Sequence, residues 1–208
     1  MKFNYLLISV MFSFLFFACG NSAKKEVQTE TTSASTSTAA PSSKSTTTMS
    51  STAAGSFETV ILKDGIASPK KEMKGMVGDT KINIVYGSPS VKGREVWGNL
   101  VPFGEVWRTG ANEATTIEFS KDVQVEGKSL PAGKYGLFTI ANADQWTIIF
   151  NKTHDQWGAY KYEESKDALR VNVTPKKGMA DSETMEFALD GSDVMLKWEK
   201  LAVAFQVK

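Results

Sequence analysis

The feature that most constrains this chain is a period of two in its apolar residues. Ile82, Ile84 and Tyr86 point to one side of an extended chain, and Lys81 and Asn83 point to the other. Alternation of this kind is typical of half-buried antiparallel strands, with one face on the core and one in water. No window of twelve or more residues shows a helical stripe. The alternation recurs at 146–150, 169–173, 185–189, 194–198 and 203–207.

Turn residues separate these runs, as at Gly78-Asp79 and Asp190–Asp193. We count about eight to ten short strands at close spacing, which is typical of a sandwich or a barrel. We therefore predict an all-β fold, an antiparallel β-sandwich with jelly-roll-like connectivity. Glu199-Lys200 reverses the parity of the apolar positions in the last run, which predicts a β-bulge there.

The N-terminus is typical of an exported protein. Residues Leu6–Ala18 are apolar except for two serines, a stretch too short to span a bilayer but of the length of a signal-peptide core. Cys19 follows it directly and resembles the lipobox of bacterial lipoproteins, in which the thiol carries lipid. We predict a lipoprotein signal peptide at 1–18, lipidation at Cys19 and attachment to the outer membrane of a bacterial envelope. The alternative is a secretory signal followed by a chance cysteine.

The next segment has the composition of a tether. In Thr31–Ser56, Ser and Thr fill 17 of 26 positions, and no aromatic residue occurs between Gly20 and Ser56. Such a segment buries too little apolar surface to offset its ordering entropy. We predict that 19–56 is the lipidated cysteine with a disordered tether, and that 57–208 is a single β-sandwich domain.

The composition excludes several classes of function. Cys19 is the only cysteine, so the domain has neither a disulfide nor a free thiol. His154 is the only histidine, which argues against multi-His metal sites, and we predict no metal and no cofactor. The formal net charge of +1 gives no electrostatic case for nucleic acid as a partner.

Functional chemistry is concentrated in residues 87–116, a connection too long for a hairpin loop. It contains the tripeptide Glu-Val-Trp twice. Aromatic faces surrounded by guanidinium, amide and carboxylate groups suit a glycan or a small anionic ligand, because rings stack on apolar faces and polar groups fix orientation. Our candidate ligand-binding residues are Arg94, Trp97, Trp107, Arg108, Asn112, Glu113, Tyr135 and Trp157.

Three other interpretations remain open. The loop could be purely structural, with Trp rings packed over ion pairs of Arg94 with Glu113, or of Arg108 with Glu95 or Glu105. The protein could be a carbohydrate-active hydrolase that uses the paired carboxylates Glu105 and Glu113. It could also bind another protein through an edge strand.

Four segments resemble the domain of unknown function 2911 family. They are GREVWG (93–98), VPFGEVWRTGANEATT (101–116), LPAGKYGLFTI (130–140) and WTIIFN (146–151). The resemblance covers roughly residues 70–208. It implies a secreted or lipid-anchored β-domain from a Gram-negative bacterium, and it carries over no catalytic residues.

Overall fold

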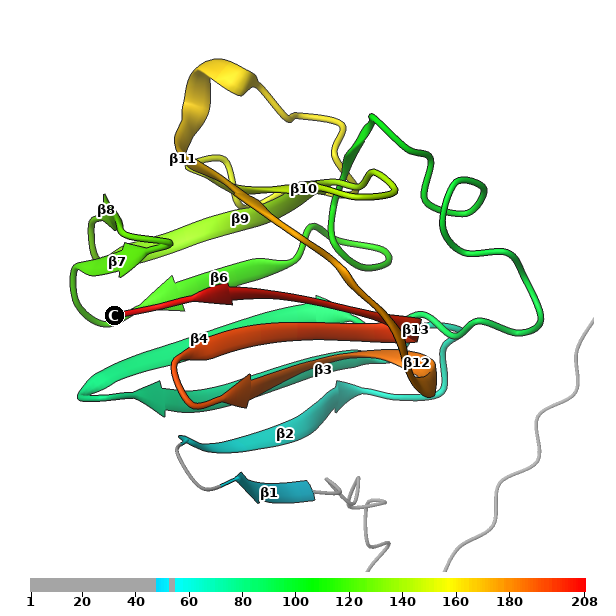
Figure 1. The fold of residues 1–208 in the computed structure, drawn as a ribbon, viewed down its shortest axis with the longest axis horizontal. Helices are drawn as coiled ribbons and strands as arrows, with labels where there is room; N and C mark the ends of the chain where they lie inside the picture. The colour runs from blue at the N-terminus through cyan, green and yellow to red at the C-terminus, as the bar shows by residue number, and fades with distance from the viewer. Residues whose placement is uncertain (1–47, 53–54) are drawn as a thin grey trace, which may run out of the picture. The chain divides into compact units, whose positions relative to one another are not determined.

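Antiparallel strands organise the part of the chain that the computed structural model describes, residues 48–52 and 55–208 (Figure 1). The larger layer is a nine-stranded sheet in which short β5 (Val106–Trp107) pairs with the end of β9. The other strands lie in the order β1 (Thr48–Thr52), β2 (Gly55–Lys63), β3 (Lys70–Val77), β4 (Thr80–Gly87), β6 (Thr116–Phe119), β9 (Gly133–Ile140), β10 (Trp146–Asn151) and β11 (Asp167–Val173).

The second layer is built on a long hairpin, β12 (Lys176–Asp190) with β13 (Asp193–Gln206). The short hairpin of β7 (Val123–Val125) and β8 (Lys128–Leu130) extends it, because the backbones of Gln124 and Lys208 exchange hydrogen bonds of 2.7 and 2.9 Å. On the other side, residues 88–92 run along β12, where the Met185 N–H donates to the Pro89 carbonyl over 2.9 Å.

The prediction of an all-β, antiparallel sandwich is confirmed. The jelly-roll connectivity is wrong, because strands that neighbour each other in the large sheet also follow each other in sequence, as in a meander. Only two residues separate β1 from β2 and β3 from β4, whereas β4 reaches β6 through the long connection 88–115. The described residues form thirteen strands, more than the eight to ten expected, because β5 has only two residues and β1 lies in the segment predicted to be a tether.

Strand β1 and the start of β2 lie within the segment 19–56, for which we predicted a tether. Backbone pairing explains how such a sequence joins a sheet, because ladder hydrogen bonds do not require apolar side chains. The predicted signal peptide and Cys19 lie outside the described residues. In the described ranges, the only helical element is a 3₁₀ turn at Glu164–Lys166, and no helix is long and apolar enough to cross a bilayer.

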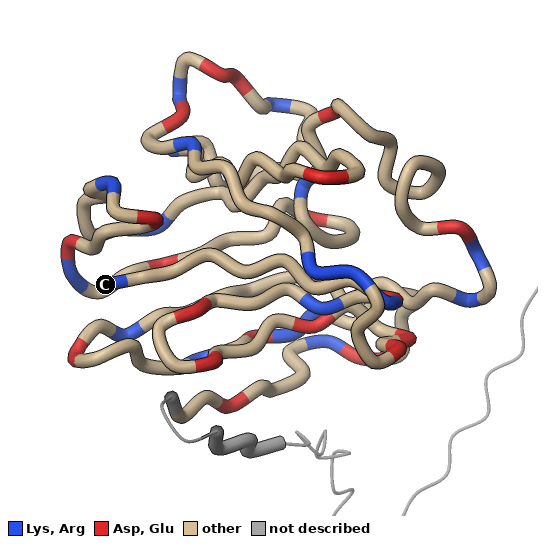
Figure 2. The backbone as a smooth tube through the Cα atoms, in the orientation of Figure 1, with Lys and Arg blue, Asp and Glu red and all other residues tan. Residues whose placement is uncertain are grey.

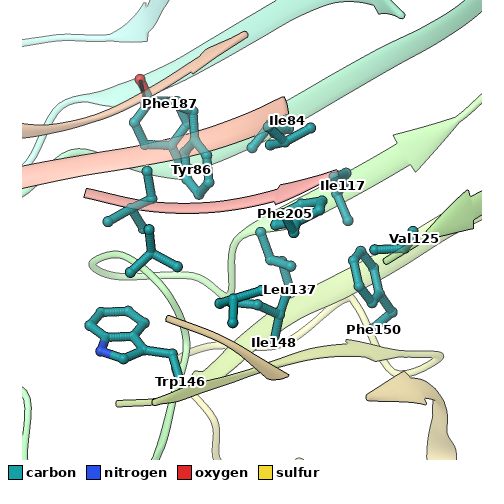
Figure 3. Close-up of a cluster of buried hydrophobic side chains, with 14 of the residues drawn as sticks. Ile84, Tyr86, Ile117, Val125, Leu137, Trp146, Ile148, Phe150, Phe187 and Phe205 are labelled. Carbon is teal, nitrogen blue, oxygen red and sulfur yellow. Dashed lines mark hydrogen bonds between the residues drawn. The ribbon is translucent and has the colours of Figure 1, made fainter. Parts of the chain in front are cut away.

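The core fills the space between the two layers. The alternation in β4 holds, since Ile82, Ile84 and Tyr86 are buried. The Tyr86 hydroxyl accepts a hydrogen bond from the Phe187 N–H of β12 over 3.4 Å, and the two rings meet edge to face with centroids 5.0 Å apart. Figure 3 shows this contact together with side chains from both layers, including Ile117, Leu137, Ile148, Phe150 and Phe205.

The pairing of β12 with β13 is irregular at Glu199, as predicted, but the bulge does not lie in the predicted strand. Glu199 has a φ of +54°, and the register shifts on both sides of its pairing with Ser182. The extra residues lie in β12, because Ser182 to Glu186 spans four positions (186 − 182) against two (199 − 197) from Lys197 to Glu199. The bulge therefore lies in β12, and Glu199 of β13 adopts a left-handed conformation where it pairs with the bulged segment.

A close backbone contact brings the long loop back to the large sheet. Gly87 ends β4, and its carbonyl accepts a hydrogen bond of 3.2 Å from the Ala111 N–H. A Cβ atom at position 87 would collide with the Ala111 carbonyl oxygen, so only glycine fits. This contact places residues 111–114 beside the end of β4 and the start of β3, where Gly87 pairs with Lys70.

Candidate functional site

Two of the candidate tryptophans are partly buried and pack against the core. Trp97 packs on Trp146 with centroids 4.9 Å apart and on Trp198 at 5.6 Å. Trp107 stacks on Trp198 at 6.0 Å, and its Nε1 donates to the Gly110 carbonyl over 3.1 Å. Trp146 and Trp198 are each 1% exposed. The tryptophans of the two Glu-Val-Trp segments thus hold the loop over one end of the sandwich. We call the cluster of Trp97, Trp107, Trp146 and Trp198 the tryptophan quartet.

Arg94 and Tyr135 also have structural contacts. The Arg94 guanidinium donates to the carbonyls of Val91 (3.1 Å) and Ser90 (2.6 Å) and so closes its own turn. The ion pair of Arg94 with Glu113, suggested for a structural loop, does not form. The Tyr135 ring is buried, and its hydroxyl donates to the Pro131 carbonyl over 2.8 Å.

Arg108 is a half-buried cation without an acidic partner. Its guanidinium makes no hydrogen bond or ion pair within the described residues, and its Nε is buried. Burial lowers the pKa of Arg108. The suggested pairs with Glu95 or Glu105 are therefore wrong, and both of those glutamates are exposed.

An open cleft of about 450 Å³ lies on the outer face of the large sheet, away from the core. Val85 and Thr116, which pair across β4 and β6, lie on this face because their neighbours Ile84 and Ile117 point into the core. We call it the outer cleft. Its polar lining comes from Lys70, Glu113, Thr116, Lys134, His154, Asp155 and Gln156.

A short backbone pairing builds one wall of the outer cleft. Residues 112–114 run antiparallel to 156–158, where the Ala114 N–H donates to the Gln156 carbonyl over 2.9 Å and the Gly158 N–H to the Asn112 carbonyl over 3.0 Å. Asn112 has a φ of +64°, a conformation that Asn tolerates better than most residues, and its Nδ2 donates to the Ser68 carbonyl over 3.3 Å. Asn112 therefore positions its neighbour Glu113 from outside the cleft.

Charges of both signs line the outer cleft. Glu113 lies 3.2 Å from the Lys70 ammonium, and its side chain is 48% exposed. Its own backbone N–H lowers the pKa of Glu113, and Lys70 lowers it further against the opposing effect of burial. Lys134 and Asp155 form no ion pair among the described residues. Two ammonium and two carboxylate groups can donate to and accept from one bound molecule.

The remaining candidates lie in different places. Trp157 is 58% exposed beside the cleft wall, and its backbone pairs with Glu113. Glu105 is exposed at the start of β5 and does not line the cleft. The structure thus brings Asn112, Glu113 and Trp157 together, and separates them from the tryptophan quartet.

The residues of the outer cleft that the sequence reasoning missed include four titratable ones, Lys70, Lys134, His154 and Asp155. They come from segments far apart in the chain, and no spacing rule links them. Lys134 lies in the LPAGKYG motif, so that motif held a signal that we did not use. In the described part of the chain, no three His, Cys, Asp or Glu side chains gather as metal ligands would.

The packing of the tryptophan quartet leads to a prediction about the stability of the fold. Replacing Trp107 with Ala removes a ring stacked on Trp198, and should lower the free energy of unfolding by about 3–5 kcal/mol in urea denaturation. Replacing the exposed Trp157 with Ala is the matched control, and should change it by less than about 0.5 kcal/mol. Equal losses in the two variants would contradict the packing of Trp107 against the core.

The environment of Glu113 leads to a prediction about its pKa and about the pH dependence of stability. Its lowered pKa should appear in an NMR titration of side-chain carboxyl carbons as a value below the ordinary 4.3 or so. Stability from this group is present above the unfolded pKa and is lost as pH falls through the folded pKa. Because the pair with Lys70 is half-exposed, that stability should be below about 1 kcal/mol. Lys70→Ala should raise the pKa of Glu113, whereas Lys81→Ala should leave it unchanged.

Comparison with known proteins identifies the family of the chain. Residues 68–207, from just before β3 to the end of the domain, match a family model described as "Protein of unknown function (DUF2911)". No curated protein and no solved structure matches the chain. The matched span contains the tryptophan quartet and the whole outer cleft. The chain therefore belongs to the DUF2911 family of proteins of unknown function.

Proposed function

We propose that this protein is a lipid-anchored protein of the bacterial envelope that binds a small hydroxylated ligand, such as a sugar or a small anionic metabolite. The observation that carries the proposal is the outer cleft. Its volume of about 450 Å³ is in the range of small-molecule sites. The binding surface is thus the end of the 87–116 loop, together with residues from β3, β9 and the 154–156 loop.

The chemistry of the cleft supports a ligand rich in hydroxyl groups. Glu113 and Asp155 can accept hydrogen bonds from hydroxyls, while Lys70 and Lys134 can donate to ring oxygens or to a carboxylate. Gln156 is buried and engaged, since its Nε2 donates to Thr153 and its Oε1 accepts from the Lys161 N–H. This amide keeps the cleft wall in place and leaves recognition to the charged groups.

The alternative of a carbohydrate-active hydrolase requires two carboxylates on either side of one bond. Of the proposed pair, only Glu113 lines the outer cleft, and Glu105 lies elsewhere on the surface. The lowered pKa of Glu113 also suits an acceptor better than a proton donor at neutral pH. Binding without turnover is therefore the function that the geometry favours.

The proposal predicts paired effects on affinity. Glucose, glucuronate and lactate would be titrated into the full-length protein by calorimetry. Lys134→Ala removes a donor and Glu113→Gln an ionised acceptor, so each should weaken binding of a sugar by about tenfold. A ligand held only through its negative charge should lose affinity with Lys134→Ala and gain it with Glu113→Gln.

Glu105→Gln is the control, because it removes an exposed carboxylate of the same loop outside the cleft. The three variants should keep the wild-type melting temperature within a few degrees, since none removes a buried group. The proposal fails if sugars, sugar acids and small hydroxy acids all leave the protein unchanged, or if binding survives in both cleft variants. Cleavage of a glycan, lost in Glu113→Gln, would favour the hydrolase instead.

The anchor has its own test. In the native host, Cys19→Ser should prevent incorporation of labelled palmitate and move the protein from the detergent phase to the aqueous phase on phase separation, because several acyl chains are needed for stable attachment. Ser22→Ala is a matched control three residues away. A Cys19→Ser protein that stays in the outer-membrane fraction would contradict lipid anchoring.

A further inference from the structure

A second pocket, with a volume of about 260 Å³, lies where loop 93–105 meets the hairpin of β12 and β13. We call it the end pocket. No residue lines both this pocket and the outer cleft, so the two sites are separate. Its principal lining residues are Trp97, Phe103, Asn142, Lys177, Glu199 and Lys200.

Two aromatic rings contribute to the apolar part of the end pocket, and both are held in place. Trp97 is packed into the tryptophan quartet by its contacts with Trp146 and Trp198. Phe103 packs over Gly98, where a Cβ atom would lie 3.0 Å from the ring and where φ is +91°. Yet Phe103 remains 45% exposed. A positioned ring with this much exposed surface can cover an apolar group of a ligand.

The irregular part of the hairpin also lines the end pocket. Glu199 adopts a left-handed conformation, which is uncommon outside glycine and is often found at functional positions. The register shifts beside it, and bulges commonly redirect side chains near binding sites. As a result the consecutive residues Glu199, Lys200 and Leu201 all line the pocket, which a regular strand would not allow.

The rim of the end pocket carries two lysines. Lys177 and Lys200 face one acid, Glu199, and Figure 2 shows the basic stretch at the start of β12, Lys176–Lys177. Lys177 has an exposed contact of 3.3 Å with Asp144. Within the described residues, the side chains of Lys200 and Asn142 make no hydrogen bond or ion pair, so their donors are available.

We infer that the end pocket binds a small amphipathic anion, an aromatic or short aliphatic body that carries a carboxylate. The body would lie between Trp97 and Phe103, and the carboxylate would accept hydrogen bonds from Lys200 and Asn142. A volume of about 260 Å³ limits the ligand to roughly one ring and a short chain. This site is additional to the proposed sugar-binding cleft and differs from it in ligand chemistry.

The inference is tested with two probes of the same shape. 3-Phenylpropionate and its neutral analogue 3-phenylpropanol would be titrated into the full-length protein, with calorimetry and tryptophan fluorescence as readouts, since Trp97 forms the wall. The carboxylate should bind saturably and about tenfold more tightly than the alcohol, the amount expected for a charged hydrogen bond. Its affinity should fall with added salt, because the lysines are at the rim.

Variants separate the contributions of charge and ring. Lys200→Gln should remove the preference for the carboxylate, and Glu199→Gln should increase affinity for it, an effect that a merely structural role would not produce. Phe103→Ala should weaken both probes equally. Lys152→Gln, at an exposed lysine outside both pockets, should change nothing.

Two controls make the outcome decisive. Glu113→Gln should leave 3-phenylpropionate binding unchanged, so that failure of the outer cleft as a sugar site does not bear on this site. Circular dichroism should show that each variant keeps its strand content. The inference is overturned if 3-phenylpropionate does not bind saturably, if the alcohol binds equally well, or if Lys200→Gln retains the preference.

Discussion

The packing of Trp97 and Trp107 against Trp146 and Trp198 is the interaction on which the rest of the surface depends. Two tryptophans from the loop and two from the strands close one end of the sandwich. Each indole brings a large apolar area, so the contact stabilises a connection that is otherwise irregular. Once the ring of Trp97 is held, it also becomes a wall of the end pocket. Beyond Trp107, the chain returns to Gly87 and presents Glu113 to the outer cleft.

The charged residues of the same loop have a different role from its rings. Arg94 closes a turn through backbone carbonyls, and Arg108 is half-buried without an acid. Neither fixes the loop through an ion pair with glutamate, which agrees with the small contribution that surface ion pairs usually make. The shape of the 87–116 loop is therefore fixed mainly by its aromatic contacts. Glu113 is left in contact with solvent and with a single lysine, where it can take part in recognition.

The two pockets flank the loop and differ in chemistry. The outer cleft combines two ammonium groups with two carboxylates, whereas the end pocket combines two aromatic rings with two lysines and Glu199. The DUF2911 match spans both of them, and it begins after β1 and β2. The sites thus belong to the family's domain, while the N-terminal strands extend its sheet from outside the matched region. Under the two proposals, one domain holds a polar and an amphipathic ligand at separate sites.

The sequence by itself determined the fold class, because a period of two in residues such as Ile82, Ile84 and Tyr86 assigns each side chain to a face. It also identified the family, through motifs such as GREVWG, and the irregular position at Glu199. Strand order, the packing of Trp97 and Trp107 against the core, and the outer cleft were decided only by tertiary structure. The physical reason is that alternation says which face is buried but not which strand covers it. Lys70, Lys134 and His154 meet only because β3, β9 and the 154–156 loop pack together.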